Sequence, residues 1–331
     1  MKTSAIAVSG LRKAYGDKAV LDGIGFDVPE GSVYSMLGPN GAGKTTTVNI
    51  LTTLLKADAG TVRVAGHDVA TGTRKVRSAI GVTGQFAAVD GLLSGRENLR
   101  MMADLKRVRS AGSLVDGLLE RFDLVESADK LTATYSGGMR RKLDLAMTLV
   151  GSPRIIFLDE PTTGLDPRSR RTMWQIVREL VADGTTIFLT TQYLEEADEL
   201  ADRIAVLSEG KIAAEGTSDE LKRLIPGGHV RLRFTDPAAY RSAVIALGEV
   251  TTDDEALSLQ IPSDGSQREL RAVLDWLDAL GIEADELTVH TPDLDDVFLA
   301  LTDRTAVPAP ANTTTDKNTT DKNTTTKETA Q

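Results

Sequence analysis

One segment constrains the fold of this 331-residue chain more than any other: residues 38–45, which match the pattern G-x-x-x-x-G-K-[ST]. A short apolar run at 32–37 precedes it, and a helical pattern at 45–55 follows it. Glycines in such a loop let backbone N–H groups turn toward phosphate oxygens, and the next helix directs its positive N-terminal end at the same anion. The order strand, loop, helix therefore predicts a nucleotide site rather than a chance glycine-rich turn.

Two side chains of this phosphate-binding loop have predicted roles of their own. Lys44 is expected to reach the β- and γ-phosphates, and the hydroxyl of Thr45 is expected to ligate Mg²⁺. The predicted nucleotide contacts are Gly38, Pro39, Asn40, Gly41, Ala42, Gly43, Lys44, Thr45 and Thr46.

The surrounding sequence alternates between strand and helix patterns. Residues 154–158 contain four consecutive apolar side chains, which leave no polar face and indicate a buried strand. Residues 185–190 form a second such run, and the segment 167–183 between them has helical periodicity. This alternation predicts a parallel sheet covered by helices. Residues around 90–150 are mostly helical in pattern and predict a helical insertion.

Two carboxylates follow the strand predicted at 154–158. Asp159 and Glu160 are then expected beside the phosphate-binding loop, because the carboxyl ends of parallel strands meet at one edge of the sheet. Asp159 is predicted to hold Mg²⁺, and Glu160 to orient and deprotonate the attacking water. Two acids that merely cap a turn would explain one carboxylate, but not this context.

A second glycine motif, Ser136-Gly137-Gly138, precedes a helical run that extends to Val150. Alone, Ser-Gly-Gly is a common turn. Before a helix, it predicts a second N-terminus that binds an anion through backbone N–H groups and the Ser136 hydroxyl.

The pattern changes at Pro226-Gly227-Gly228, a breaker cluster typical of a linker. Residues 226–304 carry 6 basic and 16 acidic side chains, whereas residues 1–225 carry 29 of each. A segment this acidic should not bind nucleic acid or anionic lipid by simple electrostatics, and a solvated acidic face is favoured over a cation site. It is predicted to be a small α/β domain with strands at 230–234 and 286–290 and helices at 237–247, 266–280 and 294–301.

Three further features of the sequence concern disorder, cysteine chemistry and membrane insertion. From Thr305 the sequence is a Thr/Asn/Asp/Lys tail of low complexity, which predicts disorder. Cysteine is absent, which excludes disulfides and cysteine nucleophiles and fits a reducing cytoplasm. The chain contains neither an apolar signal-peptide core nor a run of roughly 18 to 20 apolar residues, so work at a membrane would require a partner.

With these motifs in this order, residues 3–225 resemble an ATP-binding subunit of an ABC transporter. The resemblance implies a P-loop NTPase fold with a helical subdomain, and ATP with Mg²⁺ as cofactors. It implies that Tyr15 stacks on adenine, and that Gln85 contacts Mg²⁺ and water and senses the transmembrane partner. The loop Gly164-Leu165-Asp166 resembles the one that contacts the other protomer.

The chain departs from the family pattern in two places. The motif that usually reads Leu-Ser-Gly-Gly-Gln has Tyr135 and Met139 at its ends, but the backbone donors and Ser136 remain. The switch histidine of the family is replaced by Gln192, which can donate a hydrogen bond but cannot carry a proton near neutral pH. Catalysis is therefore predicted to depend on Glu160, with Gln192 only positioning.

Both departures, and the segment 291–302, resemble the ATP-binding subunits of daunorubicin/doxorubicin-resistance exporters. That resemblance implies a homodimer in which Ser136–Gly138 of one subunit completes the ATP site at Lys44 of the other. It implies a separate integral membrane permease, a peripheral place at the cytoplasmic face, and export of an antibiotic such as an anthracycline. Segment 291–302 is then regulatory or dimer-supporting, and equally a docked amphipathic helix with Leu294, Val297, Phe298 and Leu301 on one face.

Two other functions remain open. The first is export of another cargo, such as a lipid, glycan or ion, because an ATPase subunit need not touch cargo. The second is a non-transport ABC ATPase acting on DNA or ribosomes, which the single phosphate-binding loop and the lack of basic excess disfavour; no nucleic-acid partner is expected. The predicted organisation is an ATP-binding domain at 1–225 with the helical insertion at about 90–150, an acidic domain at 226–304, and a tail at 305–331.

Overall fold

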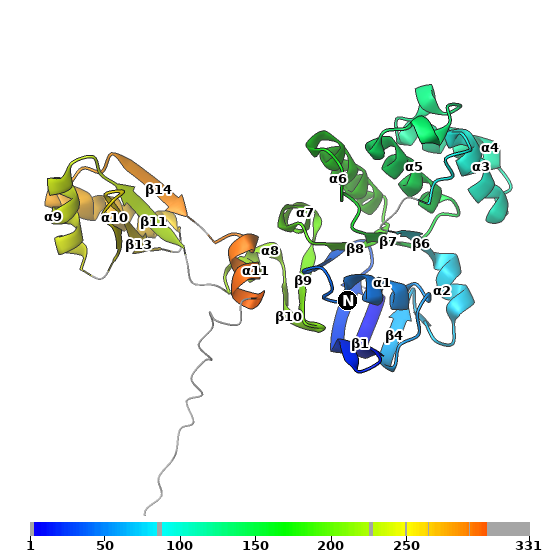
Figure 1. Ribbon diagram of the computed structural model, residues 1–331, viewed down its shortest axis with the longest axis horizontal. Helices are drawn as coiled ribbons and strands as arrows, with labels where there is room; N and C mark the ends of the chain where they lie inside the picture. Colours follow the sequence, from blue (N-terminus) through cyan, green and yellow to red (C-terminus); the bar gives the residue numbers. More distant parts are fainter. Residues whose placement is uncertain are drawn as a thin grey trace, which may run out of the picture.

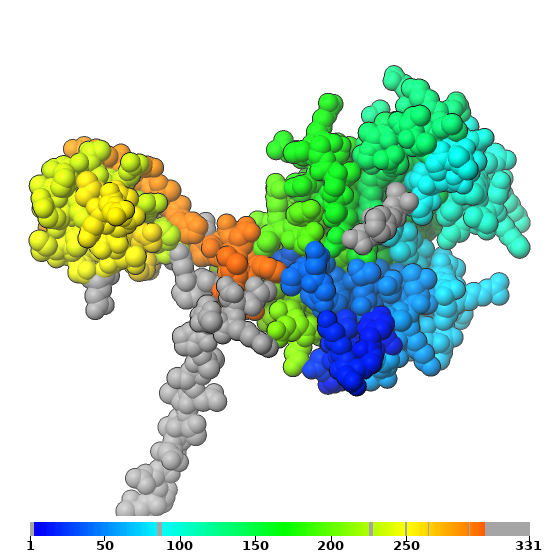
Figure 2. Space-filling view, in the orientation of Figure 1, coloured from blue at the N-terminus to red at the C-terminus, as the bar shows by residue number. Residues whose placement is uncertain are grey.

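In its described residues, the computed structural model has three β-sheets and their helices (Figure 1). In Figure 2 the yellow residues form a lobe of their own, and an orange segment joins that lobe to the green and blue part. The predictions for Gln85 and for the tail at 305–331 lie outside the described residues. The structure describes residues 3–84, 88–224, 228–248, 250–263, 265–290 and 292–302.

The central sheet has six strands in the order β10-β9-β3-β8-β7-β6. All neighbours are parallel except β10, which pairs antiparallel with β9, so the predicted parallel sheet is confirmed. Every residue of β3, β7 and β8 is buried, as expected of strands covered on both faces. The strands are β3 (Val33–Leu37), β6 (Ile80–Thr83), β7 (Ile155–Asp159), β8 (Thr186–Thr191), β9 (Arg203–Ser208) and β10 (Lys211–Gly216).

A second, antiparallel sheet packs beside the central one. Its order is β2-β1-β4-β5, and its Phe26 stacks on Tyr34 of β3 with ring centroids 5.2 Å apart. Phe188 of β8 stacks on the same Tyr34 at 5.7 Å, which joins the two sheets through one aromatic cluster. The elements are β1 (Ser4–Tyr15), β2 (Lys18–Pro29), β4 (Ala59–Val64), β5 (His67–Asp68), α1 (Lys44–Leu51) and α2 (Thr73–Ala79).

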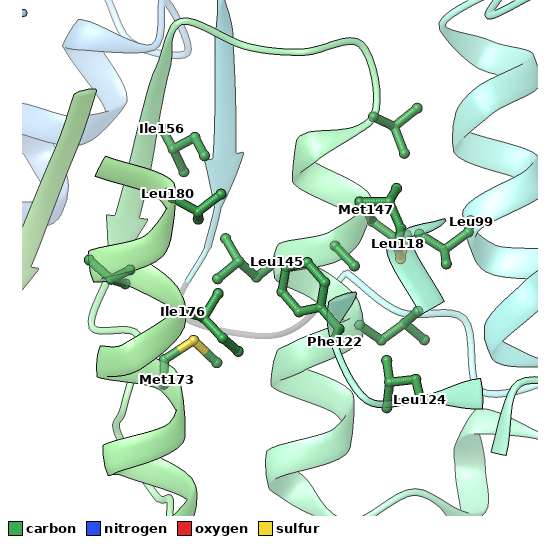
Figure 3. Packing of buried hydrophobic residues seen from close by; sticks show 14 of the residues in the cluster. Leu99, Leu118, Phe122, Leu124, Leu145, Met147, Ile156, Met173, Ile176 and Leu180 are labelled. Atoms are coloured by element: carbon green, nitrogen blue, oxygen red, sulfur yellow. The ribbon is translucent and has the colours of Figure 1, made fainter. Parts of the chain in front are cut away.

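Three helices occupy the region expected to be helical. Ser94 begins the first of them with a capping box, in which its hydroxyl accepts from the N–H of Glu97 and the Glu97 carboxylate accepts from the N–H of Ser94. Their core is continuous with the central sheet: in Figure 3, Phe122 and Leu145 share one cluster with Ile156 of β7. The helices are α3 (Gly95–Leu105), α4 (Ala111–Arg121) and α5 (Gly137–Leu149), with α6 (Pro167–Ala182) on the same cluster and short 3-10 turns at Val125–Ser127 and Thr132–Thr134.

The C-terminal lobe, residues 229–290, has the order βαββαβ and an antiparallel sheet β12-β13-β11-β14, which is a split βαβ arrangement. The predicted strands at its two ends and both of its helices are confirmed. The hairpin of β12 and β13 was not predicted, because β12 is three exposed polar residues without apolar alternation. The elements are β11 (His229–Arg233), α9 (Pro237–Leu247), β12 (Thr251–Asp253), β13 (Ser258–Pro262), α10 (Gln267–Leu280) and β14 (Glu286–His290).

The last helix, α11 (Leu294–Thr302), leaves the C-terminal lobe and contacts α7 (Leu194–Leu200), α8 (Ser218–Lys222) and β9 (Figure 1). The expectation of a docked amphipathic helix is confirmed, because its apolar face packs into a cluster with residues of α7, α8 and β9. No helix in the described part of the chain is long and apolar enough to cross a membrane. The residues of α11 in this cluster are Leu294, Val297, Phe298 and Leu301.

Candidate active site

The phosphate-binding loop lies between β3 and α1, where Gly43 caps the helix with a φ of +113°. A Cβ atom on Gly43 would lie 2.7 Å from Cδ2 of Leu21 and 2.9 Å from the carbonyl oxygen of Val20, so no larger residue fits without movement. The N–H of Gly38 donates to the carbonyl of Thr191 at 3.3 Å, which attaches the loop to the end of β8.

The backbone of this loop can bind an anion. Among the described residues, the N–H groups of Asn40, Gly41 and Gly43 have no hydrogen-bond acceptor in the protein. Gly41 has a φ of +82° and open space around it. Unpaired N–H groups at the positive end of a helix donate hydrogen bonds to phosphate oxygens. The loop therefore fits the phosphates of a nucleotide.

Lys44 lies inside this loop and is only 5% exposed. Its Nζ donates to the carbonyl oxygens of Gly38 at 2.8 Å and Pro39 at 3.1 Å, and lies 3.6 Å from Oε1 of Glu160. Burial lowers the pKa of Lys44, and the negative charge of Glu160 partly opposes that effect. The ammonium group of Lys44 therefore lies next to the carboxylate of Glu160, the predicted catalytic base.

Asp159 ends β7 and is buried. Its Oδ1 accepts a hydrogen bond from the hydroxyl of Thr190 at 2.5 Å, and the hydroxyl of Thr45 lies 3.4 Å from the same atom. Carboxylate and hydroxyl oxygens are ligands of the hard kind that Mg²⁺ prefers, so the donor set of Asp159 and Thr45 fits this ion.

Glu160 has a backbone conformation that is unusual for a residue with a side chain, with a φ of +49°. Its N–H donates to the carbonyl of Thr190 at 3.0 Å, and its Oε2 accepts from the hydroxyl of Thr163 at 3.3 Å. Backbone strain of this kind persists only where the surroundings hold it, and an observed outlier beside a phosphate loop supports a functional role.

Gln192 and Tyr15 lie at the margin of this cluster. Gln192 follows Thr191, whose carbonyl holds the phosphate-binding loop, and its half-buried side chain has no hydrogen bond within the described part of the chain. Tyr15 ends β1 and is 52% exposed, with Nζ of Lys13 at 5.7 Å from its ring centroid. It belongs to the same β-hairpin as Leu21, which contacts Gly43.

The Ser-Gly-Gly motif stands outside this cluster. Ser136 caps α5, where its hydroxyl accepts from the N–H of Met139 at 3.2 Å, and both Ser136 and Gly137 are exposed. Gly138 packs against the first turn of α6, because a Cβ there would lie 2.6 Å from Oγ of Ser169. Among the described residues, no hydrogen bond or ion pair joins residues 136–138 to the phosphate-binding loop.

Sequence reasoning missed Arg141, which is only 7% exposed. It lies in the run Arg-Arg-Lys at 140–142, which reads as a solvent-facing basic patch. The available signal was helical spacing, because Arg141 precedes Leu145 of the buried face by one turn. Its guanidinium donates to the carbonyl of Asp159 at 3.2 Å, so it belongs to the site.

Comparison with known proteins agrees with this geometry. Residues 21–163 match the model of the ABC transporter family. The chain is 48% identical over 306 residues to a daunorubicin resistance ATP-binding protein, DrrA3, of Streptomyces coeruleorubidus, which covers 91% of this chain and 97% of that protein. It is 38% identical to a Nod factor export ATP-binding protein I of Burkholderia orbicola, over 92% of this chain and 99% of that protein.

A solved structure extends the comparison to the fold. It is the dimeric, post-hydrolysis state of an ATP-binding cassette bound to ADP and Pi, 25% identical to this chain with a TM-score of 0.59, covering 64% of this chain and 98% of that one. The chain therefore belongs to the ATP-hydrolysing, ATP-binding subunits of ABC transporters, of the daunorubicin/doxorubicin-resistance type.

Proposed function

We propose that this subunit uses ATP hydrolysis to drive export of an anthracycline-class antibiotic through a separate membrane permease. The hydrolytic part rests on one observation: Lys44, Asp159 and Glu160 are buried together where β3, β7 and β8 end. The cargo rests on the daunorubicin resistance protein, which is 48% identical over most of both chains.

Each residue of the cluster has a proposed task in hydrolysis. The loop N–H groups and Lys44 bind the β- and γ-phosphates, while Tyr15 stacks on adenine. Thr45, Asp159 and Gln85 would hold Mg²⁺, which would neutralise negative charge on the phosphate oxygens. Glu160 orients the attacking water and accepts its proton, a contribution that is typically worth about 10²–10⁴ in rate. Gln192 donates a hydrogen bond toward the γ-phosphate and takes no proton.

The active form in this proposal is a homodimer. Ser136 and Gly137 are exposed at the N-terminus of α5 and are not joined to the loop of their own chain. A second copy then supplies these N–H donors to the phosphate held by Lys44. The dimeric state of the solved cassette supports this arrangement.

The permease is proposed to dock in a hollow of about 460 Å³ between β6 and α3. Its rim exposes apolar side chains, among them Leu54, which is 68% exposed, and Met101. Exposed apolar side chains that line a hollow are typical of a protein-binding surface. Docking there holds the subunit at the cytoplasmic face of the membrane. Further described residues that line the hollow are Val82, Ala88, Met102, Asp144, Met147 and Thr148.

In this proposal, residues 1–225 form the domain that binds ATP. The acidic segment 226–304 then comprises the C-terminal lobe and α11. Because α11 packs on α7 and α8, this segment is attached to the ATP-binding domain at its far end as well as by the chain at 225–228.

Three variants test the hydrolytic proposal. Lys44→Ala should abolish ATP binding, because the loop loses its cation. Glu160→Gln should retain ATP and lower turnover by about 100-fold or more. Gln192→Ala should lower turnover by about tenfold, since it removes one hydrogen bond. Steady-state ATPase assays measure turnover, and nucleotide titration measures ATP affinity. Parental turnover in Glu160→Gln would contradict the catalytic role of this carboxylate.

Deletion of the subunit in its host tests the cargo. Anthracycline susceptibility should rise on deletion and return to the parental level when the parental chain, but not Glu160→Gln, is restored. Unchanged susceptibility would refute the antibiotic and favour another cargo, an alternative that the 38% identical Nod factor export protein supports. Purification without any membrane protein would favour a non-transport ATPase.

A further inference from the structure

The buried guanidinium of Arg141 binds the backbone of the turn that carries Glu160. Its Nε donates to the carbonyl of Pro161 at 2.9 Å, and its Nη2 donates to the carbonyls of Asp159 at 3.2 Å and Glu160 at 3.3 Å. These three carbonyls belong to consecutive residues around the strained φ of Glu160. Only a planar fork with several N–H donors can hold them together.

The other side of the same guanidinium contacts Gly84 and Asp144. Nη1 of Arg141 donates to the carbonyl of Gly84 at 2.8 Å and lies 3.5 Å from Oδ2 of Asp144. Oδ1 of Asp144 accepts the N–H of Ala88 at 3.0 Å. Arg141 and Asp144 together therefore bind the backbone at Gly84 and at Ala88.

The position of Asp144 gives this pair a second connection. Asp144 lines the hollow in which we place the permease, together with Ala88 and Met147. Arg141 and Asp144 are both buried, and burial raises the pKa of Asp144 and lowers that of Arg141. A buried ion pair often makes no net contribution to the free energy of folding. Stability alone therefore does not explain why Arg141 and Asp144 are buried together.

We propose that Arg141 and Asp144 form a positioning pair that ties the backbone of Glu160 to the wall of the permease hollow and to the backbone at Gly84 and Ala88. This inference rests on the proposed roles of Glu160 and of the hollow. Displacement of Gly84, Ala88 or Asp144 then moves the carbonyls around Glu160 through one rigid guanidinium, and a misplacement of about 1 Å at a catalytic group can cost about 100-fold in rate.

Arg141→Lys is the first test, because it keeps the buried charge pair but lacks the fork. Its kcat for ATP should fall by about tenfold or more while KM stays within about twofold, since the loop around Lys44 is untouched. Lys142→Arg is the matched control: it makes the reverse exchange at the next position, where Lys142 pairs with the exposed Asp123. Parental kcat in Arg141→Lys, with both variants folded, would overturn the proposal.

A double-variant cycle separates positioning from a merely structural ion pair. Arg141→Gln, Asp144→Asn and the double variant are compared by kcat and by melting temperature in the full-length chain. A positioning pair predicts that the double variant regains melting temperature, because no unpaired buried charge remains, yet keeps the low kcat of Arg141→Gln. A double variant with restored kcat, or with kcat lowered by the product of the two single effects, contradicts it.

Glu160→Gln, assayed in parallel, distinguishes this inference from the proposed function. If Glu160→Gln is inactive while the Arg141 variants keep parental kcat, only the positioning pair fails. If Glu160→Gln itself retains parental turnover, the catalytic role on which the pair depends fails first.

Discussion

The ATP-binding part and the C-terminal lobe both pack helices on a β-sheet, yet they bury different kinds of side chain. In the ATP-binding part, β3, β7 and β8 are buried along their whole length, and charged groups are buried where those strands end. In the lobe, β12 and β14 contain no buried residue. Within its described residues, the buried polar side chains are two serines, Ser258 and Ser263.

This difference indicates where chemistry can occur. Buried charges are costly and need partners, so a cluster of them marks a candidate functional site, and Lys44, Asp159 and Glu160 form such a cluster. The lobe keeps its charged side chains out of its core, in line with the predicted solvated acidic face. The lobe therefore offers no buried charged cluster among its described residues, and its attachment through α11 becomes the feature to test.

Two glycines with positive φ give the sharpest test of the comparison. Gly43→Ala should weaken ATP binding by at least about tenfold, because its φ of +113° and the contact with Leu21 leave no room for a methyl group. Gly281→Ala, at the end of α10 in the lobe, has a φ of +63° and open space, so it should cost about 1 kcal/mol of stability and leave ATP binding unchanged. Nucleotide titration measures ATP affinity, and thermal unfolding measures stability. Equal ATP affinities in Gly43→Ala and Gly281→Ala would contradict the difference between the two regions.

The docking of α11 gives a second test, which concerns stability and not ATP affinity. Leu294→Ala removes a side chain that is 3% exposed and should weaken the attachment of α11 by about 2–5 kcal/mol. Leu299→Ala, on the exposed side of the same helix, should change stability by less than about 0.5 kcal/mol. Hydrogen exchange of the α11 amides reports the difference. Equal protection in the two variants would show that α11 is not held by this apolar face.

The smallest effect concerns a buried acid of the ATP-binding part. Burial raises the pKa of Glu196 above 4.5, although its Oε1 accepts from Nε1 of Trp174 at 3.2 Å. A raised folded-state pKa stabilises the protein below the unfolded pKa, and that stability is lost as pH rises through the folded pKa. Glu196→Gln should therefore gain melting temperature relative to the parent as pH rises. A melting-temperature difference between Glu196→Gln and the parent that does not change with pH would contradict the raised pKa of Glu196.

Much of the site was predictable because its signals are local. The glycine pattern at 38–45 predicted the loop at the start of α1, and the apolar run at 155–158 predicted the buried strand that leads to Asp159 and Glu160. Ser136 was predicted at a helix N-terminus and is the cap of α5. The burial of Arg141 was missed, because a basic run on a helix reads as solvated, although its helical spacing to Leu145 pointed to the buried face. Its backbone partners were not predictable, because Gly84 and Asp159 lie far from it in the sequence.

The sequence by itself determined the elements and the chemistry of the loop, since periodicity, capping and the G-x-x-x-x-G-K-[ST] pattern act over a few residues. The tertiary structure decided which distant groups meet. Thr45 and Asp159 approach across 114 positions, and Arg141 reaches Gly84 across 57. It also decided that α11 packs on α7 and α8. Such contacts depend on how sheets and helices pack in space, and an apolar helix face carries no local mark of the partner that will cover it.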